Sequence, residues 1–155
     1  MPRLDRLPEA SRKGLLALAV QVNETAPFVR PAKPLAQCRV AIVTTAGMHR
    51  RSDMPFGPGE QGYRVIPSDT PGAGIVQSHT SIGFDRVPTL RDVNISLPID
   101  RLRELAGRGE IALGPNHYSF MGALRDTVRI DGETGPEVAR RLAADGADVA
   151  LITPT

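Results

Sequence analysis

The chain of 155 residues contains a single cysteine, Cys38, which excludes an internal disulfide and any zinc site built on cysteines. Aromatic residues make up 4% of the sequence and tryptophan is absent, so Ala, Val, Leu and Ile must build the core. The formal net charge is only +2, and no long basic run favours a nucleic-acid partner. The sequence shows no signal peptide and no apolar stretch long enough for a bilayer, which predicts a cytoplasmic protein without membrane contact.

Two apolar runs indicate buried strands. The first, Val40–Val43, lacks any alternation of polar and apolar residues, as is typical of strands covered on both faces in a parallel sheet. The second, Val149–Ile152, follows a helix that is expected to begin at Gly135 and to end at Gly146. These patterns predict an α/β fold, a three-layer domain with a mostly parallel central sheet and long loops at the strand ends.

The chain is predicted to have two parts. Residues 1–34 are expected to form an N-terminal helix, from about Pro8 to Asn23, and a Pro-rich linker. Residues 35–155 are expected to form the α/β domain. Within it the patterns predict short strands at Tyr63–Pro67, Asn94–Leu97 and Ile111–Leu113, a helix at Pro98–Ala106, and long loops at Gly47–Gly62, Ser78–Arg86 and Gly114–Gly122.

The residues that end the first strand are candidates for ligand binding, because ligands of open α/β sheets lie at the carboxyl ends of the strands. Thr44, Thr45 and Gly47 offer hydroxyls and backbone amides to an anion, and His49 and Arg50 follow directly. No G-x-G-x-x-G pattern and no Walker lysine is present, so a dinucleotide or P-loop site is not supported.

The three histidines, His49, His79 and His117, each lie in a loop after a strand-like segment. Together with Asp85 they have the chemistry of a metal site, but their spacings match no compact metal motif, and an ordinary polar role is the simpler interpretation of each one alone. Asp85 follows His79 by six residues and is a candidate to orient it.

Six segments in order, RVAIVTTAGMH, YRVIP-SDT, SHTSIGFDR, DVNISLPIDRLREL, NHYSFMG and DGADVALITPT, resemble the selenoprotein B family. That family includes the B component of glycine, sarcosine and betaine reductases and the related subunit of D-proline reductase. The resemblance extends from about Arg39 to Thr155. In the family, a strand that ends like LITPT is followed at once by a selenocysteine or cysteine.

The resemblance implies that the catalytic chalcogen would stand directly after Thr155. A nucleophile there, past a buried strand and beside a helix N-terminus, would have a lowered pKa. We expect Thr155 to precede a UGA codon that was read as a stop, so that the domain is truncated at its carboxyl end and this chain alone is inactive. A natural end and a deliberate shortening are the competing explanations.

The resemblance also implies a reaction, the reductive cleavage of the C–N bond of glycine, betaine, sarcosine or proline-type substrates. It implies no cofactor within this chain, a pyruvoyl group on a partner that activates the amine, partner subunits, a thioredoxin-like thiol reductant and a homo-oligomer. On this interpretation His79 and His117, with Asp85, are the catalytic candidates for proton transfer. Binding of the small carboxylate/amine substrate is assigned to Thr44, Thr45, Gly47, His49, Arg50, Tyr118, Ser119 and Thr153.

Two alternatives stay open at this point. One is a non-catalytic module that binds a carboxylate ligand in the same loops. The other is a metal-dependent lyase or hydrolase that uses His49, His79 and His117.

Overall fold

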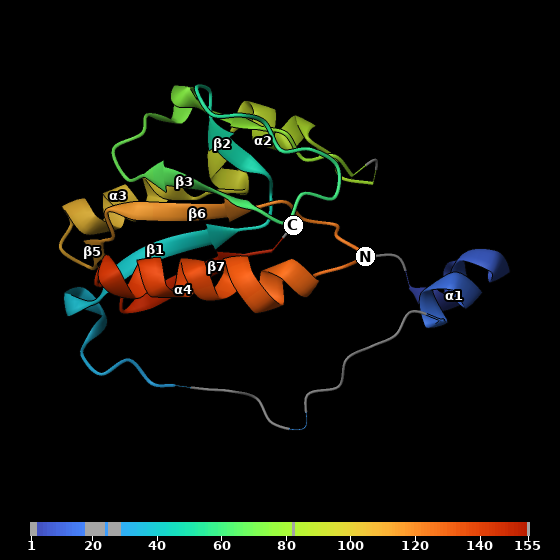
Figure 1. Cartoon of the computed structure of the whole chain (residues 1–155), viewed down its shortest axis with the longest axis horizontal. Coiled ribbons are helices and arrows are strands. Elements are labelled where there is room, and N and C mark those ends of the chain that lie inside the picture. Colours follow the sequence, from blue (N-terminus) through green and yellow to red (C-terminus); the bar gives the residue numbers. More distant parts are fainter. Residues whose placement is uncertain (1–2, 18–23, 25–28, 82, 155) are drawn as a thin grey trace. The chain divides into compact units, whose positions relative to one another are not determined.

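The computed structural model describes residues 3–17, 24, 29–81 and 83–154. It divides into two compact units, 1–30 and 31–155 (Figure 1). In the first unit, α1 (Glu9–Leu16) begins after Pro8, and Leu16 is 64% exposed. The rest of the predicted helix, residues 18–23, and part of the linker, residues 25–28, lie outside the described residues. The predicted domain boundary after residue 34 stays a prediction.

The second unit is built on a mixed sheet with β1 at its centre (Figure 1). One edge of β1 pairs in parallel with β7, and the other pairs in parallel with β5 and then with β6. The outer strand β3 runs antiparallel to β6, and β2 and β4 form a separate antiparallel ribbon. The bounds are β1 (Arg39–Thr44), β2 (Met48–Arg50), β3 (Tyr63–Pro67), β4 (Ile75–Gln77), β5 (Ala112–Leu113), β6 (Asn116–Phe120) and β7 (Val149–Thr153).

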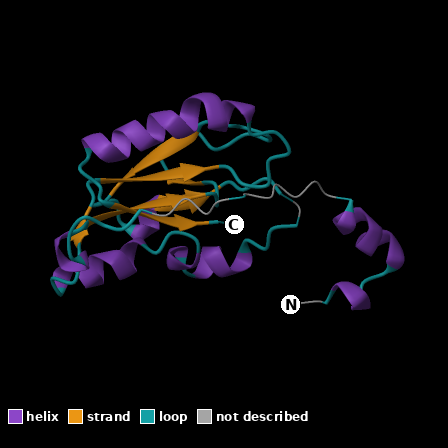
Figure 2. Cartoon of the chain, turned by 90° about the horizontal axis from the view of Figure 1, so that it is seen from below, coloured by secondary structure: helices purple, strands orange, loops and turns teal. Residues whose placement is uncertain are grey.

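Helices cover both faces of this sheet (Figure 2). On one face Ile42 packs in a cluster with Leu102 of α3, and on the other Phe120 packs with Val138 of α4. The α/β fold class is therefore confirmed, with a sheet that is mixed rather than purely parallel. The remaining bounds are α2 (Val87–Arg91), α3 (Ile99–Gly107), α4 (Gly135–Ala144), the short helical turns Leu4–Arg6, Leu35–Gln37, Gly72–Gly74 and Val93–Ile95, and a π-helix at Ile130–Thr134. No helix in the described ranges is long and apolar enough to cross a membrane.

Three local predictions were wrong. The loop expected at Gly47–Gly62 contains β2, because Met48–Arg50 pair with β4. The strand expected at Asn94–Leu97 is instead a 3₁₀ turn, because the Asp92 side chain accepts a hydrogen bond from the Asn94 amide and caps that turn. The loop expected at 114–122 contains β6, whose polar side chains at His117 and Ser119 are fully buried. Polarity concealed this strand, because its polar residues lie inside the sheet rather than in solvent.

Candidate functional site

The carboxyl ends of β1 and β7 lie side by side, with Thr44 opposite Thr153. Both hydroxyls donate to the carbonyl oxygen of Ser96, at 2.9 Å from Thr44 and 3.0 Å from Thr153. Thr44 is fully buried, and its hydroxyl also accepts a hydrogen bond from the Ala46 amide. Two of the three predicted substrate-binding threonines, Thr44 and Thr153, thus hold the strand ends against the segment after α2.

The chain beyond β1 passes directly against His79. Thr45 donates its backbone N–H to the Thr153 carbonyl at 3.3 Å, and Gly47 accepts from the Ser78 amide at 3.0 Å. Gly47 has φ +63°, and a Cβ on it would lie 3.1 Å from the backbone nitrogen of His79. Both this close approach and this left-handed backbone favour glycine.

The His79 ring is buried, with 1% of the residue exposed, and lies 4.4 Å from the ring of Phe84 between centroids. Its Nδ1 accepts from the Ser81 amide at 3.3 Å, so the proton of the neutral ring lies on Nε2. Burial lowers the pKa of His79 below its ordinary value, and the positive charge of Arg86 lowers it further. Within the described ranges Nε2 is buried and has no hydrogen-bond partner. His79 therefore presents an N–H donor that the fold itself does not use.

Among the hydrogen bonds of the described residues, none joins the Asp85 carboxylate to the His79 ring. Its carboxylate accepts from the Val87 amide at 2.9 Å, at the start of α2. The ring of Phe84, which sequence reasoning did not single out, packs against His79 instead.

His117 is fully buried, and its side chain is hydrogen-bonded to β1 between the residues that pair with β5 and those that pair with β6. Its Nδ1 accepts from the Ile42 amide at 3.0 Å, and its Nε2 lies 3.1 Å from the hydroxyl of Ser68, which in turn donates to the Gly114 carbonyl. Burial, aided by the charge of Arg103, lowers the pKa of His117 to about 4. The ring is neutral at neutral pH, and both nitrogens are engaged inside the fold.

Tyr118 and Ser119 lie on opposite faces of β6, because successive strand residues alternate. The Tyr118 hydroxyl donates to Asp145 at 3.0 Å on the α4 side. Burial, together with this hydrogen bond, raises the pKa of Tyr118 to about 12. Ser119 is fully buried beside Thr44 in the register, and in the described part of the chain its hydroxyl has no partner.

His49 and Arg50 belong to β2. His49 is 3% exposed and its Nδ1 lies 2.8 Å from the carbonyl oxygen of Arg50. Arg50 donates from Nη2 to Asp53 at 2.7 Å. Burial raises the pKa of Asp53, but the hydrogen bonds and charge of Arg50 bring that pKa below its ordinary value.

Among the residues that the structure describes, no three His, Cys, Asp or Glu side chains are grouped to hold a metal ion. The histidines therefore do not form the metal site considered as an alternative.

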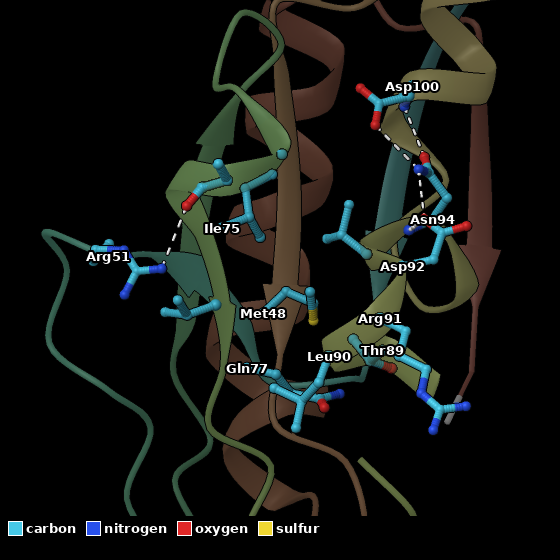
Figure 3. Close-up of a pocket in the computed structure, with 14 residues that line it drawn as sticks. Met48, Arg51, Ile75, Gln77, Thr89, Leu90, Arg91, Asp92, Asn94 and Asp100 are labelled. Atoms are coloured by element: carbon cyan, nitrogen blue, oxygen red, sulfur yellow. Dashed lines mark hydrogen bonds between the residues drawn. The ribbon is translucent and has the colours of Figure 1, made fainter. Parts of the chain in front are cut away.

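A cleft of about 600 Å³ lies between the β2–β4 ribbon and the segment from α2 to Asp100 (Figure 3). Gln77 lines it and donates from Nε2 to the Ala46 carbonyl at 3.0 Å, just beyond β1. Thr89 lines the other wall, with its hydroxyl 2.7 Å from that of Ser96. The cleft is thus joined to the carboxyl ends of β1 and β7. Sequence reasoning missed both residues, because neither belongs to a recognisable motif.

The chain is similar to two curated proteins. It is 41% identical over 123 residues to the D-proline reductase subunit gamma of Acetoanaerobium sticklandii, a match that covers 78% of this chain and 50% of that protein. It is 25% identical over 127 residues to the sarcosine reductase complex component B subunit beta of Peptoclostridium acidaminophilum, covering 79% of this chain and 29% of that protein. The match therefore spans half of the first relative and less of the second. No family model and no solved structure matches the chain.

Proposed function

We propose that this chain belongs to the nucleophile-bearing subunit of a reductase of the D-proline and sarcosine type. The similarity to components of those two reductases supports the proposal and agrees with the resemblance to the selenoprotein B family. The proposed reaction cleaves the C–N bond next to a carboxylate, in D-proline, sarcosine or a similar substrate. A selenocysteine or cysteine after Thr155 supplies the nucleophile in this proposal. A pyruvoyl group on a partner subunit activates the amine, and an external thiol returns two electrons.

The observation that carries the proposal is the arrangement at the carboxyl ends of β1 and β7. Thr153 is paired with Thr44, and its carbonyl accepts from the Thr45 amide, so the chain leaves β7 beside the segment that reaches Gly47. Gly47 in turn lies against His79. This path supports a nucleophile that emerges close to a buried imidazole.

His79 fits the proton chemistry of this reaction better than His117. When a C–N bond is cleaved reductively, the departing nitrogen needs a hydrogen-bond donor and finally a proton. The Nε2–H of His79 is buried and has no partner among the described residues. Both nitrogens of His117 are engaged inside the fold, at Ile42 and Ser68, so neither is left to contact a substrate. We therefore assign the donor role to His79, while proton transfer by His117 stays an untested prediction.

Partner subunits are part of the proposal. The matched proteins are named as a subunit gamma and as a subunit of a complex. The exposed apolar residues of β7 support contact with another polypeptide. Leu151 is 38% exposed and Ile152 is 64% exposed. Pairing with a thioredoxin-like reductant and homo-oligomerisation stay proposals of the same kind.

The test is a cleavage assay with the complete gene product, its partner subunits and a dithiol reductant. Reductive opening of the D-proline ring adds two electrons and two protons and yields a primary amine. o-Phthalaldehyde detects this primary amine but does not react with the secondary amine of proline. We expect primary amine from D-proline, or methylamine from sarcosine. His79→Gln should lower kcat at least about tenfold, whereas the exposed α4 variant Arg140→Gln should not. If neither substrate yields an amine while an authentic reductase does, the proposal is wrong.

A further inference from the structure

The cleft beside β4 combines an apolar floor with polar groups at its two ends. Met48 and Ile75 are buried and belong to the core cluster on this face of the sheet, and Val93 packs against them. Figure 3 shows Gln77, Leu90 and Arg91 toward one end of the cleft and Asp100 toward the other. The floor suits a small apolar body, and the ends suit charged or hydrogen-bonding groups.

Gln77 supplies a fixed acceptor. Its Nε2 is held by the Ala46 carbonyl at 3.0 Å, which determines the orientation of the amide. Its Oε1 is buried and, within the described ranges, accepts no hydrogen bond. A buried carbonyl oxygen without a donor is costly, so a ligand N–H at this point would complete the site.

Arg91 supplies the charge at the same end. It lies on the last turn of α2 and lines the cleft, and its guanidinium makes no ion pair or hydrogen bond with any residue that the structure describes. Arg50, the arginine that the sequence favoured for the substrate, is already bound to Asp53. An unpaired guanidinium is the usual partner of a carboxylate.

We propose that this cleft binds a small imino or amino acid, with its carboxylate on Arg91, its protonated nitrogen donating to Gln77 Oε1, and its apolar body over Met48. The proposal rests on the proposed function, since it names where the substrate of that reaction is held. The position of the cleft agrees with the proposed function. Gln77 is hydrogen-bonded to Ala46, just beyond β1, and Thr89 is hydrogen-bonded to Ser96, whose carbonyl accepts from the Thr153 hydroxyl. Both walls therefore reach the strand ends where the nucleophile is proposed to emerge.

The test is isothermal titration of the complete gene product with D-proline. Two variants perturb the cleft without touching a buried group: Leu90→Trp, at a residue 76% exposed, narrows the cleft, and Arg91→Gln removes its charge. Each should raise Kd at least about tenfold. Val128→Trp, at a residue 75% exposed outside the cleft, and Arg140→Gln are the matched controls and should stay within about twofold.

Two ligand analogues test the assigned contacts separately. Cyclopentanecarboxylate lacks the nitrogen and should bind more weakly by about tenfold, because Gln77 Oε1 then stays unpaired. D-Proline methyl ester lacks the negative charge and should lose affinity with the native chain but not with Arg91→Gln. The proposal is overturned if the native chain shows no saturable binding, or if Leu90→Trp binds D-proline as tightly as the native chain.

The cleavage assay separates this inference from the proposed function. If D-proline is cleaved and Leu90→Trp leaves its KM unchanged, the cleft is not the substrate site although the function stands. If D-proline binds in the cleft and is not cleaved by the complete complex, the function fails and the binding site stands.

Discussion

Acidification should destabilise the α/β unit through His117, and the effect can be calculated from its surroundings. The folded pKa is about 4 and the ordinary value is 6.5. The unfolded chain therefore binds the proton more tightly, so stability from this group is full above about pH 6.5 and is lost as the pH falls toward 4. The whole shift corresponds to about 3 kcal/mol, of which about 2 kcal/mol is lost by about pH 5.

The assay is urea unfolding of the native chain and of His117→Gln, followed by circular dichroism between about pH 7.5 and pH 5. The variant lacks the titrating ring, so the difference in unfolding free energy between the two proteins should shrink by about 2 kcal/mol across this range. Arg140→Gln should keep the full pH dependence. A difference that is constant with pH, or an NMR titration that gives His117 a pKa near 6.5, would refute the reasoning.

Three further perturbations test the packing. Gly135→Ala should lower stability by about 2 kcal/mol or more in thermal unfolding, because its Cβ would lie 2.5 Å from the Ile130 carbonyl oxygen; a neutral effect would contradict this geometry. Thr44→Val should cost about 1–2 kcal/mol, since the hydroxyl bonded to the Ser96 carbonyl is buried, and an unchanged urea midpoint would be the contrary result. Tyr118 should ionise only near pH 12 in an ultraviolet titration of the native state, and an ordinary midpoint near 10 would argue against its buried bond to a carboxylate.

The predictable part of the fold is the part that apolar runs specify. Val40–Val43 and Val149–Ile152 became the parallel neighbours β1 and β7, and the helices predicted at Pro98–Ala106 and from Gly135 onward are present as α3 and α4. Apolar runs and helical periods are the strongest local signals in a sequence, and β1 is largely buried as predicted. The burial predicted for Val149–Ile152 was wrong, because β7 pairs with β1 as a strand whose residues Leu151 and Ile152 are exposed. The antiparallel pairing of β3 with β6 depends on contacts between distant segments, and no local pattern reports it.

The site was predicted less fully, for a related reason. His79, His117 and Ser119 were singled out as polar loop residues, yet all three are buried, and the sequence cannot say which of them the fold satisfies. The structure satisfies both ring nitrogens of His117, since Nδ1 accepts from the Ile42 amide and Nε2 is hydrogen-bonded to the Ser68 hydroxyl. The cleft was not foreseen, because its walls come from β4 and from the segment after α2, which only the folded chain brings together.

The central claim is that a chalcogen nucleophile follows β7 beside His79. The most direct measurement is the gene sequence beyond the codon for Thr155. We predict a UGA or cysteine codon there, followed by an open reading frame that continues in the same register. A different stop codon, or a UGA followed by noncoding sequence, would contradict the claim and would leave the cleft beside Gln77 as a binding site without this chemistry.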